Sequence, residues 1–218
     1  MNTAARSATM IALITLVAAC SQIDRSRAVG NSEVSATTMA QQVCASCHGV
    51  TGNSVSPAFP KLAGQQRDYL VSQLAEFKSH NRSNPAGVQY MWGFSDLSPE
   101  QVQGLADYFS SQAPTFGPAG NAALEAEGRR IFTDGIPDKG VTMCSACHGA
   151  RGEGNAQFPR LAGQHADYVA KQLLIFQRTD QRPLGAAMKQ VTHELSDRQI
   201  QALAVFLQSF SSMNRPGF

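Results

Sequence analysis

The sequence predicts an all-α protein that consists of two tandem domains with the same fold. The first observation is an internal repeat: residues 59–77 align with residues 158–176, and residues 97–109 align with residues 195–207. Two copies about a hundred residues apart are two complete domains rather than the short units of a solenoid. The second observation is that apolar residues recur at helical spacing in both copies, whereas no segment shows a persuasive β-strand alternation.

The first helix expected in each domain leads into a cysteine motif. In the first domain it begins near Thr37, and in the second it occupies about residues 121–133. A second helix follows each motif, because Leu70, Leu74 and Phe77 recur at helical spacing, as do their counterparts at positions 169, 173 and 176.

The third helix of each domain has an explicit start signal. Ser98 and Gln101 form a capping box. In this motif the serine side chain accepts from the backbone N–H of the glutamine, and the glutamine side chain accepts from the backbone N–H of the serine. Ser196 and Gln199 repeat this pattern in the second domain, and Pro99 suits the first helical position of the first. We therefore expect the two helices to begin at equivalent points of the repeat.

Residues 1–20 have the pattern of a secretion signal with a lipobox. Arg6 provides the positive start, and the apolar run of residues 10–19 is too short to span a bilayer. The ending Val-Ala-Ala-Cys resembles a bacterial lipobox, after which Cys20 becomes the lipidated N-terminus; ordinary cleavage after Ala19 is the alternative. Cys20 is also the one cysteine of five outside the repeated motifs, and a free thiol is a liability in an oxidising compartment. We expect a periplasmic protein that lipidated Cys20 anchors to a bacterial membrane surface.

The remaining boundaries follow from composition. Residues 21–36 are polar without an apolar period, and they predict a tether. The two domains are predicted at residues 37–113 and 121–212, with a Pro- and Gly-rich linker at 114–120 and a tail at 213–218. The formal net charge of +2 gives no indication of nucleic-acid binding.

Each domain contains one Cys-x-x-Cys-His motif. The members are Cys44, Cys47 and His48 in the first domain, and Cys144, Cys147 and His148 in the second. Two thiols on one helical turn can add to the two vinyl groups along one edge of haem, and the histidine that follows can then reach the iron. The motifs therefore predict two covalently bound haem c groups, with His48 and His148 as axial ligands of the irons.

Three other uses of paired cysteines compete with this interpretation. A structural zinc site needs four ligands close in space, whereas each domain offers two cysteines and one well-placed histidine. A thioredoxin-like redox pair needs a βαβ setting, which is absent from the pattern. Disulfides fit the spacing, but they leave both histidines unexplained.

A sixth iron ligand decides between an electron carrier and an enzyme. Met91 and Met188 each lie about forty residues after the motif histidine and just before the capped helix, in a polar stretch that we interpret as a loop. We predict that these two methionines bind the irons on the face opposite the histidine. The alternative is that they are core residues, which is the usual role of a lone methionine.

The remaining three histidines are interpreted as surface residues. His193 is a rival ligand in the second domain, but its counterpart in the first domain is Ser95. His80 and His165 align with a threonine and a glutamine, so neither position is a histidine in both repeats.

On these motifs the sequence resembles the tandem dihaem cytochromes c of the cytochrome c4 family. The match covers about residues 37–211 and includes the segments FPKLAGQ and FPRLAGQ and the methionines before LSPEQ and LSDRQ. The resemblance implies two class I cytochrome c domains that face each other through pseudo-twofold symmetry, with haem propionates close to the domain boundary. It also implies that the carbonyls of Pro60 and Pro159 accept from Nδ1–H of the motif histidines, and that Leu62 and Leu161 pack on haem.

The resemblance also suggests residues for contacts around the propionates or between domains, with a role on the helix surface or in the core as the alternative. These candidates are Arg67, Tyr69, Tyr168, Gln65 and Gln164. Members of the family are often described as soluble or loosely membrane-bound, whereas the lipobox predicts an anchor.

We expect a dihaem electron carrier, not an enzyme, that works by outer-sphere transfer between a bc-type respiratory reductase and a terminal oxidase. Histidine and methionine fill both axial positions, so no position is left for a substrate. One alternative is a cytochrome c subunit of a periplasmic dehydrogenase or reductase complex. Another is a dihaem peroxidase, which needs one displaceable iron ligand and an acid–base pair above that iron.

Overall fold

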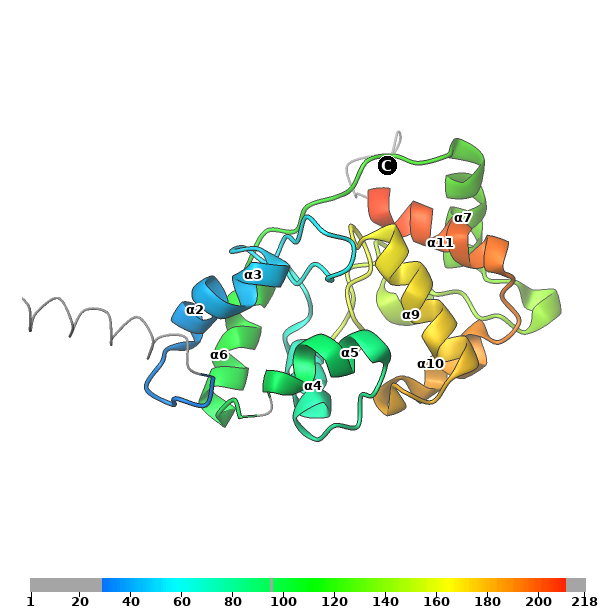
Figure 1. The fold of residues 1–218 in the computed structure, drawn as a ribbon. Helices are drawn as coiled ribbons and strands as arrows, with labels where there is room; N and C mark the ends of the chain where they lie inside the picture. The colour runs from blue at the N-terminus through cyan, green and yellow to red at the C-terminus, as the bar shows by residue number, and fades with distance from the viewer. Residues whose placement is uncertain (1–28, 95, 211–218) are drawn as a thin grey trace, which may run out of the picture.

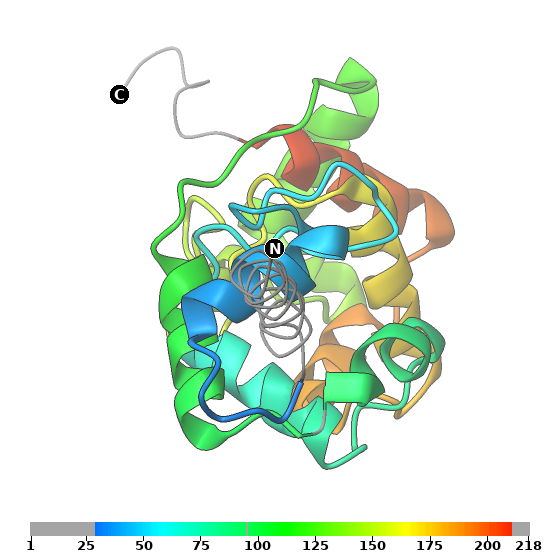
Figure 2. The same cartoon turned by 60° about the vertical axis from the view of Figure 1, so that its left-hand side comes forward.

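The computed structural model describes residues 29–94 and 96–210, and the regular elements of this part of the chain are helices, as predicted. They contain no β-strand, only isolated β-bridges from Ile136 to Val141 and from Asn155 to Phe158. The helices form two groups, α2 to α6 on one side of the molecule and α7 to α11 on the other (Figure 1). Figure 2 shows the first group in front of the second. No helix in the described part of the chain is long and apolar enough to cross a membrane.

The first domain follows the predicted order, with additional short helices. Its elements are α2 (Ala36–Met39), the π-helical turn η1 (Ala40–Cys44), α3 (Ala45–His48), α4 (Arg67–Lys78), α5 (Pro85–Met91), the 3-10 turn η2 (Trp92–Phe94) and α6 (Pro99–Ser110). The side chain of Ser35 caps α2 by accepting from the N–H of Thr38. The elements α2, η1 and α3 follow one another without a break, so the first helical segment carries the chain directly into the cysteine motif.

The second domain has the same arrangement with a longer first helix. Its elements are α7 (Ala122–Asp134), η3 (Pro137–Lys139), α8 (Ser145–His148), α9 (Ala166–Arg178), η4 (Pro183–Gly185), α10 (Ala186–Thr192) and α11 (Asp197–Ser209). Asn121 caps α7 by accepting from the N–H groups of Ala123 and Leu124. Each domain has its own apolar core, centred on Met39 and Phe109 in the first and on Phe132 in the second.

Both predicted capping boxes are present. The hydroxyls of Ser98 and Ser196 accept from the N–H of the third helical residue, and the side chains of Gln101 and Gln199 accept in return. The third helix of each domain therefore begins where the sequence predicted.

The segments that carry Met91 and Met188 are helical, so their interpretation as loops was wrong. Both helices contain seven residues, and Pro85 at the first turn of α5 suits a helix start. Helices this short are marginal alone and depend on packing against neighbouring elements, here α4 and α9. Their mixture of small and polar residues does not form an apolar stripe, so the sequence pattern did not indicate them.

Residues 29–35, the second part of the predicted tether, pack on the first domain. Val34 is 8% exposed and belongs to the core. The side-chain amide of Gln101 donates to the carbonyls of Asn31 and Val34, at 2.8 and 3.0 Å. The first domain therefore begins before residue 37.

The first and last helices of each domain cross closely at a glycine. A Cβ on Gly104 of α6 would lie 2.5 Å from the Cβ of Ala36 on α2. In the second domain the glycine is on the first helix instead, and a Cβ on Gly128 of α7 would overlap the carbonyl of Ala202 on α11. The backbone carbonyl cannot rotate away as a side chain can, so Gly128 sets the distance between these helices.

We predict that Gly128→Ala lowers the free energy of unfolding by about 1–3 kcal/mol, the range for overpacking a close contact. This loss opposes the gain of up to about 1 kcal/mol that alanine brings inside a helix. Denaturant unfolding followed by circular dichroism measures the change. Gly93→Ala is the matched control, because a Cβ there meets nothing within 4 Å. Equal stability of the two variants would contradict the prediction.

Candidate functional site

The two cysteine motifs adopt the same local structure. Cys44 ends η1 and directly precedes α3, which carries Cys47 and His48. In the second domain Cys144 likewise directly precedes α8, which carries Cys147 and His148. Each cysteine pair therefore spans one helical turn, and both thiols emerge on the same side of it. This arrangement fits attachment along one edge of a porphyrin.

Both motif histidines are buried and are held by the same hydrogen bond. His48 is 7% exposed, and its Nδ1 lies 2.8 Å from the carbonyl oxygen of Pro60. His148 is 6% exposed, and its Nδ1 lies 2.9 Å from the carbonyl oxygen of Pro159. Because a carbonyl only accepts, Nδ1 carries the proton and the lone pair of Nε2 is left for a metal. Both hydrogen bonds were implied by the family resemblance.

Burial determines the protonation of these histidines. It lowers the pKa of His48 and His148 more than the bond to the proline carbonyl raises it. The neutral imidazole is the form that binds metals. Both side chains therefore have the tautomer and the neutral charge that binding an iron requires.

After each motif the chain forms a loop that turns back, so that the carbonyl of a later proline lies beside the motif histidine. The carbonyl of Gly52 accepts from the N–H groups of Leu62 and Ala63, at 2.7 and 3.1 Å. Gly52 has a φ of +75°, and a Cβ there would lie 2.8 Å from both the nitrogen of Ala63 and Cδ1 of Phe109, so the turn requires glycine. Gly152 accepts the corresponding pair of bonds in the second domain.

The surroundings of the cysteines do not fit the competing uses of paired thiols. Burial raises the pKa of Cys44 and of Cys144 to about 11, whereas a redox-active dithiol has a lowered pKa. None of the four motif cysteines forms a disulfide. Within residues 29–94 and 96–210, no group of three or more His, Cys, Asp or Glu side chains is placed to hold a metal ion, whereas a structural zinc site uses four ligands close in space.

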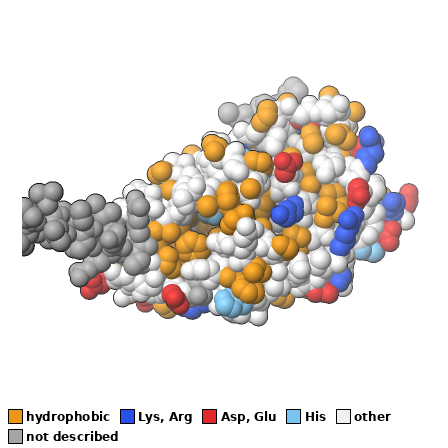
Figure 3. All heavy atoms as spheres, in the orientation of Figure 1, with side chains coloured by type: hydrophobic (Ala, Val, Ile, Leu, Met, Phe, Trp, Pro, Cys, Tyr) orange, Lys and Arg blue, Asp and Glu red, His pale blue; other side chains and the backbone are white. Residues whose placement is uncertain are grey.

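The two methionines lie near the surface of the core rather than within it. Met91 is the last residue of α5 and Met188 lies within α10, and both are half-buried. Met39, by comparison, is completely buried in the first core. Figure 3 shows apolar side chains around a hollow between α3 and α5, the helices that carry His48 and Met91. Leu62 and its counterpart in the second domain are half-buried and pack against the cores.

The other histidines differ in their positions. His80 and His193 are exposed, as predicted, and His80 stacks on Trp92 with ring centroids 4.3 Å apart. His165 was also predicted to lie on the surface, and this was wrong. Its Nε2 lies 3.0 Å from the hydroxyl and 2.9 Å from the carbonyl oxygen of Ser54, in the other domain. Alignment of the repeats could not indicate a contact between them.

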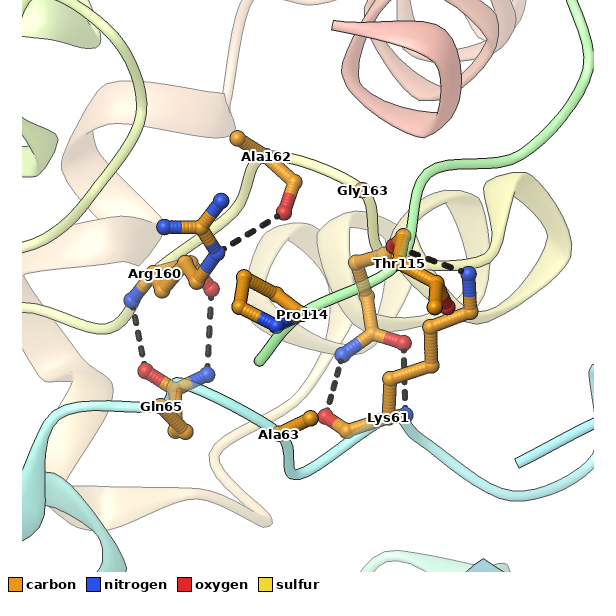
Figure 4. A pocket seen from close by; sticks show the side chains of 9 residues that line it. Lys61, Ala63, Gln65, Pro114, Thr115, Arg160, Ala162 and Gly163 are labelled. Atoms are coloured by element: carbon orange, nitrogen blue, oxygen red, sulfur yellow. Dashed lines mark hydrogen bonds between the residues drawn. The ribbon is translucent and has the colours of Figure 1, made fainter. Parts of the chain in front are cut away.

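Gln65 and Gln164 join the two domains through a pair of matching contacts. Gln65 donates to the carbonyl of Arg160 at 3.0 Å and accepts from its N–H at 2.6 Å. Gln164 bonds both backbone groups of Lys61 in the same way, at 2.9 Å each (Figure 4). Both glutamines are buried, so the predicted role between domains is confirmed for them.

The two tyrosines also reach across the interface, to arginines that the sequence analysis missed. The hydroxyl of Tyr69 accepts from Arg182 at 2.9 Å, and that of Tyr168 accepts from Arg82 at 3.4 Å. Arg67 instead bonds Asp107 of its own domain, which is the alternative role on the helix surface. Arg82 lies five residues after Phe77, but Arg182 lies six after Phe176, and this shift hid the match between the repeats.

Comparisons with known proteins agree with the repeated fold. The Cytochrome c family profile matches residues 35–113 and 125–211. Cytochrome c4 of Stutzerimonas stutzeri is 39% identical over 206 residues, which cover 90% of this chain and 97% of that protein. The crystal structure of reduced recombinant cytochrome c4 from Pseudomonas stutzeri matches with a TM-score of 0.71 and 39% identity, covering 78% of this chain and 94% of that chain. A thiosulfate dehydrogenase electron acceptor of Stutzerimonas stutzeri (strain A1501) is 34% identical over 171 residues, covering 77% of this chain and 78% of that protein.

Two cytochrome c domains imply two haem c groups, one for each buried motif histidine. The duplicated profile match and the extent of the similarity show that the chain belongs to the dihaem cytochrome c4 family, and it is an electron carrier rather than an enzyme.

Proposed function

We propose that this cytochrome c4 transfers electrons between a bc-type respiratory reductase and a terminal oxidase at the periplasmic surface of a bacterial membrane. The observation that supports the proposal best is the repetition, in both domains, of a buried histidine whose Nδ1 bonds a proline carbonyl beside a pair of cysteines. One such site would hold a single redox centre, and two on one chain allow an electron to pass between centres.

Residues of the chain determine how each haem would be held. The motif cysteines would form the thioether bonds, and Nε2 of His48 and His148 would bind the irons. Met91 and Met188 would supply the opposite ligands, and this histidine and methionine pair raises the reduction potential. Haem, when bound, supplies reversible one-electron chemistry. Burial of the histidines excludes water and limits their movement between oxidation states, which favours rapid transfer.

A second candidate differs in the partner only. Similarity to a thiosulfate dehydrogenase electron acceptor supports a role as the acceptor subunit of a periplasmic dehydrogenase. Both roles use the same iron ligands. Affinity purification from native membranes separates them, because an acceptor subunit remains bound to its dehydrogenase, whereas a free carrier leaves the column without one.

A membrane anchor also belongs to the proposal. Cys20 lies outside the described residues, and support for its lipidation comes from the lipobox pattern. Acyl chains on Cys20 would keep the domains at a membrane surface without a spanning helix.

We predict that Met91→Ala and Met188→Ala each convert one of the two haems to a high-spin state. Loss of the thioether removes the sulfur-to-iron charge-transfer band of that haem and lowers its reduction potential. Optical spectra and a redox titration of the purified protein measure both effects. Met143→Ala is the control, because Met143 is 45% exposed beside the second motif. An unchanged spectrum in either variant means that the wrong ligand was assigned.

We further predict that wild-type protein incorporates labelled palmitate and sediments with membranes. Cys20→Ser removes the acceptor thiol, so the variant loses the label and moves to the periplasmic extract. Retention of both haems in the variant shows that export was unaffected. Wild-type protein without label would contradict lipidation.

A further inference from the structure

Met91 is the last residue of the short helix that carries it, whereas Met188 lies inside its helix. α5 ends at Met91, and η2 follows with Trp92 as its first residue. α10 continues after Met188 to Thr192, whose side chain is 1% exposed and donates to the carbonyl of Met188 at 2.7 Å. The position of Met91 therefore depends on contacts outside its own helix.

The N-terminal ends of the two helices pack in the same way. A Cβ on Gly87 of α5 would lie 2.9 Å from Cε1 of Phe77 on α4. A Cβ on Gly185, directly before α10, would overlap Cε1 of Phe176 on α9. These glycines bring both helices close against the long helix that precedes them. The difference between the domains therefore lies at the residues that follow the methionines.

Trp92 links the end of α5 back to the segment that follows α4. Its indole N–H donates to the carbonyl of Arg82 at 3.0 Å. Its ring stacks on the imidazole of His80, with the ring planes 18° apart and the centroids 4.3 Å apart. Its backbone N–H donates to the carbonyl of Gly87. The side chain of Trp92 therefore closes a loop over residues 80–92, directly beside Met91.

The backbone of His80 indicates that this loop has a defined shape. His80 has a φ of +59°, which is in the left-handed region that residues other than glycine adopt at a cost. Its N–H donates to the carbonyl of Phe77 in the last turn of α4, at 3.1 Å. A strained residue of this kind persists where the surrounding structure determines it. The stack on Trp92 joins this turn to the end of α5.

The residue after Met188 is of a different kind. Lys189 is exposed, and its ammonium group pairs with the exposed carboxylate of Asp180 at 2.7 Å. An exposed ion pair contributes little to stability and is screened by salt. Trp92 is half-buried, stacked and hydrogen-bonded, which fixes it more firmly. The two domains therefore differ in what holds the residue next to the methionine.

We propose that Trp92 is a positioning residue, which holds Met91 at the iron of the first domain and so keeps that iron closed to other ligands. The inference rests on the proposed function, in which Met91 binds this iron. A ligand from solution binds only after the methionine has left. Its apparent affinity therefore measures the fraction of molecules in which Met91 is displaced, and the contacts of Trp92 lower that fraction.

The test is a titration of the ferric dihaem protein with cyanide, followed by optical spectra in which Met91→Ala identifies the haem of the first domain. Trp92→Ala raises the cyanide affinity of this haem about tenfold, the size expected for the loss of one hydrogen bond and one ring contact. It also weakens the sulfur-to-iron charge-transfer band of this haem, while the haem of the second domain keeps its wild-type affinity. Trp92→Phe keeps a ring against His80 and loses only the N–H, so its effect is smaller.

Two control variants separate positioning from general stability. Lys189→Ala changes the residue after Met188 and leaves the cyanide affinity of both haems unchanged. Gly104→Ala overpacks α6 against Ala36 of α2, in the same domain as Trp92. It lowers the stability of that domain but leaves its cyanide affinity unchanged, because it touches neither Trp92 nor Met91.

Four results overturn the inference: an unchanged first haem in Trp92→Ala, equal changes in both haems, or an effect of Gly104→Ala or of Lys189→Ala as large as that of Trp92→Ala. If Trp92→Ala does not fold, His80→Asn takes its place, because asparagine adopts a positive φ and the substitution removes the stacked ring. We expect a rise of about threefold in that variant, and no rise overturns the inference. An unchanged spectrum in Met91→Ala contradicts the proposed function instead, so the two failures are distinguishable.

Discussion

The bond from Nδ1 of a buried histidine to a proline carbonyl is the constraint around which each domain is arranged. It fixes the ring, leaves Nε2 unprotonated, and requires the chain to turn back within twelve residues of His48 and eleven of His148. The turn at Gly52 and its counterpart at Gly152 make that return possible. Such bonds to a metal-binding histidine orient it and tune its basicity. Burial adds the neutral charge state, so local backbone geometry and solvent exclusion together prepare an iron ligand.

The two domains meet through buried polar groups, and this gives their interface its specificity. Gln65 and Gln164 use side-chain amides to bond backbone groups of the opposite domain, which permits one register only. The linker is also held against the first domain, because the backbone N–H and the hydroxyl of Thr115 donate to the side-chain oxygen of Asn53. A buried network that is fully hydrogen-bonded favours one rigid arrangement over alternatives. For an electron carrier with two centres, a fixed arrangement keeps the distance between the centres constant.

The sequence predicted those features that depend on local chemistry. The cysteine motifs, the capping boxes at Ser98 and Ser196 and the long helices follow from residues close in the chain, and the structure contains them. Features that depend on distant contacts were missed. α5 and α10 are too short to be indicated by periodicity, and His165 becomes an interface residue only because Ser54 of the other repeat lies against it. Arg82 and Arg182 were missed because a one-residue shift between the repeats hid their match, and because their contacts to tyrosines of the other domain join residues far apart in the sequence. Coordination by Met91 and Met188 stays a prediction.

Covalent attachment is the most direct consequence of placing a buried, metal-ready histidine beside two thiols on one helical turn. Peptide mapping of the mature wild-type protein by mass spectrometry measures it without any substitution. We expect two porphyrin adducts, one on the peptide that contains Cys44 and Cys47 and one on the peptide that contains Cys144 and Cys147. Unmodified cysteines in either peptide would contradict the account of that domain, and unmodified cysteines in both would contradict the account as a whole.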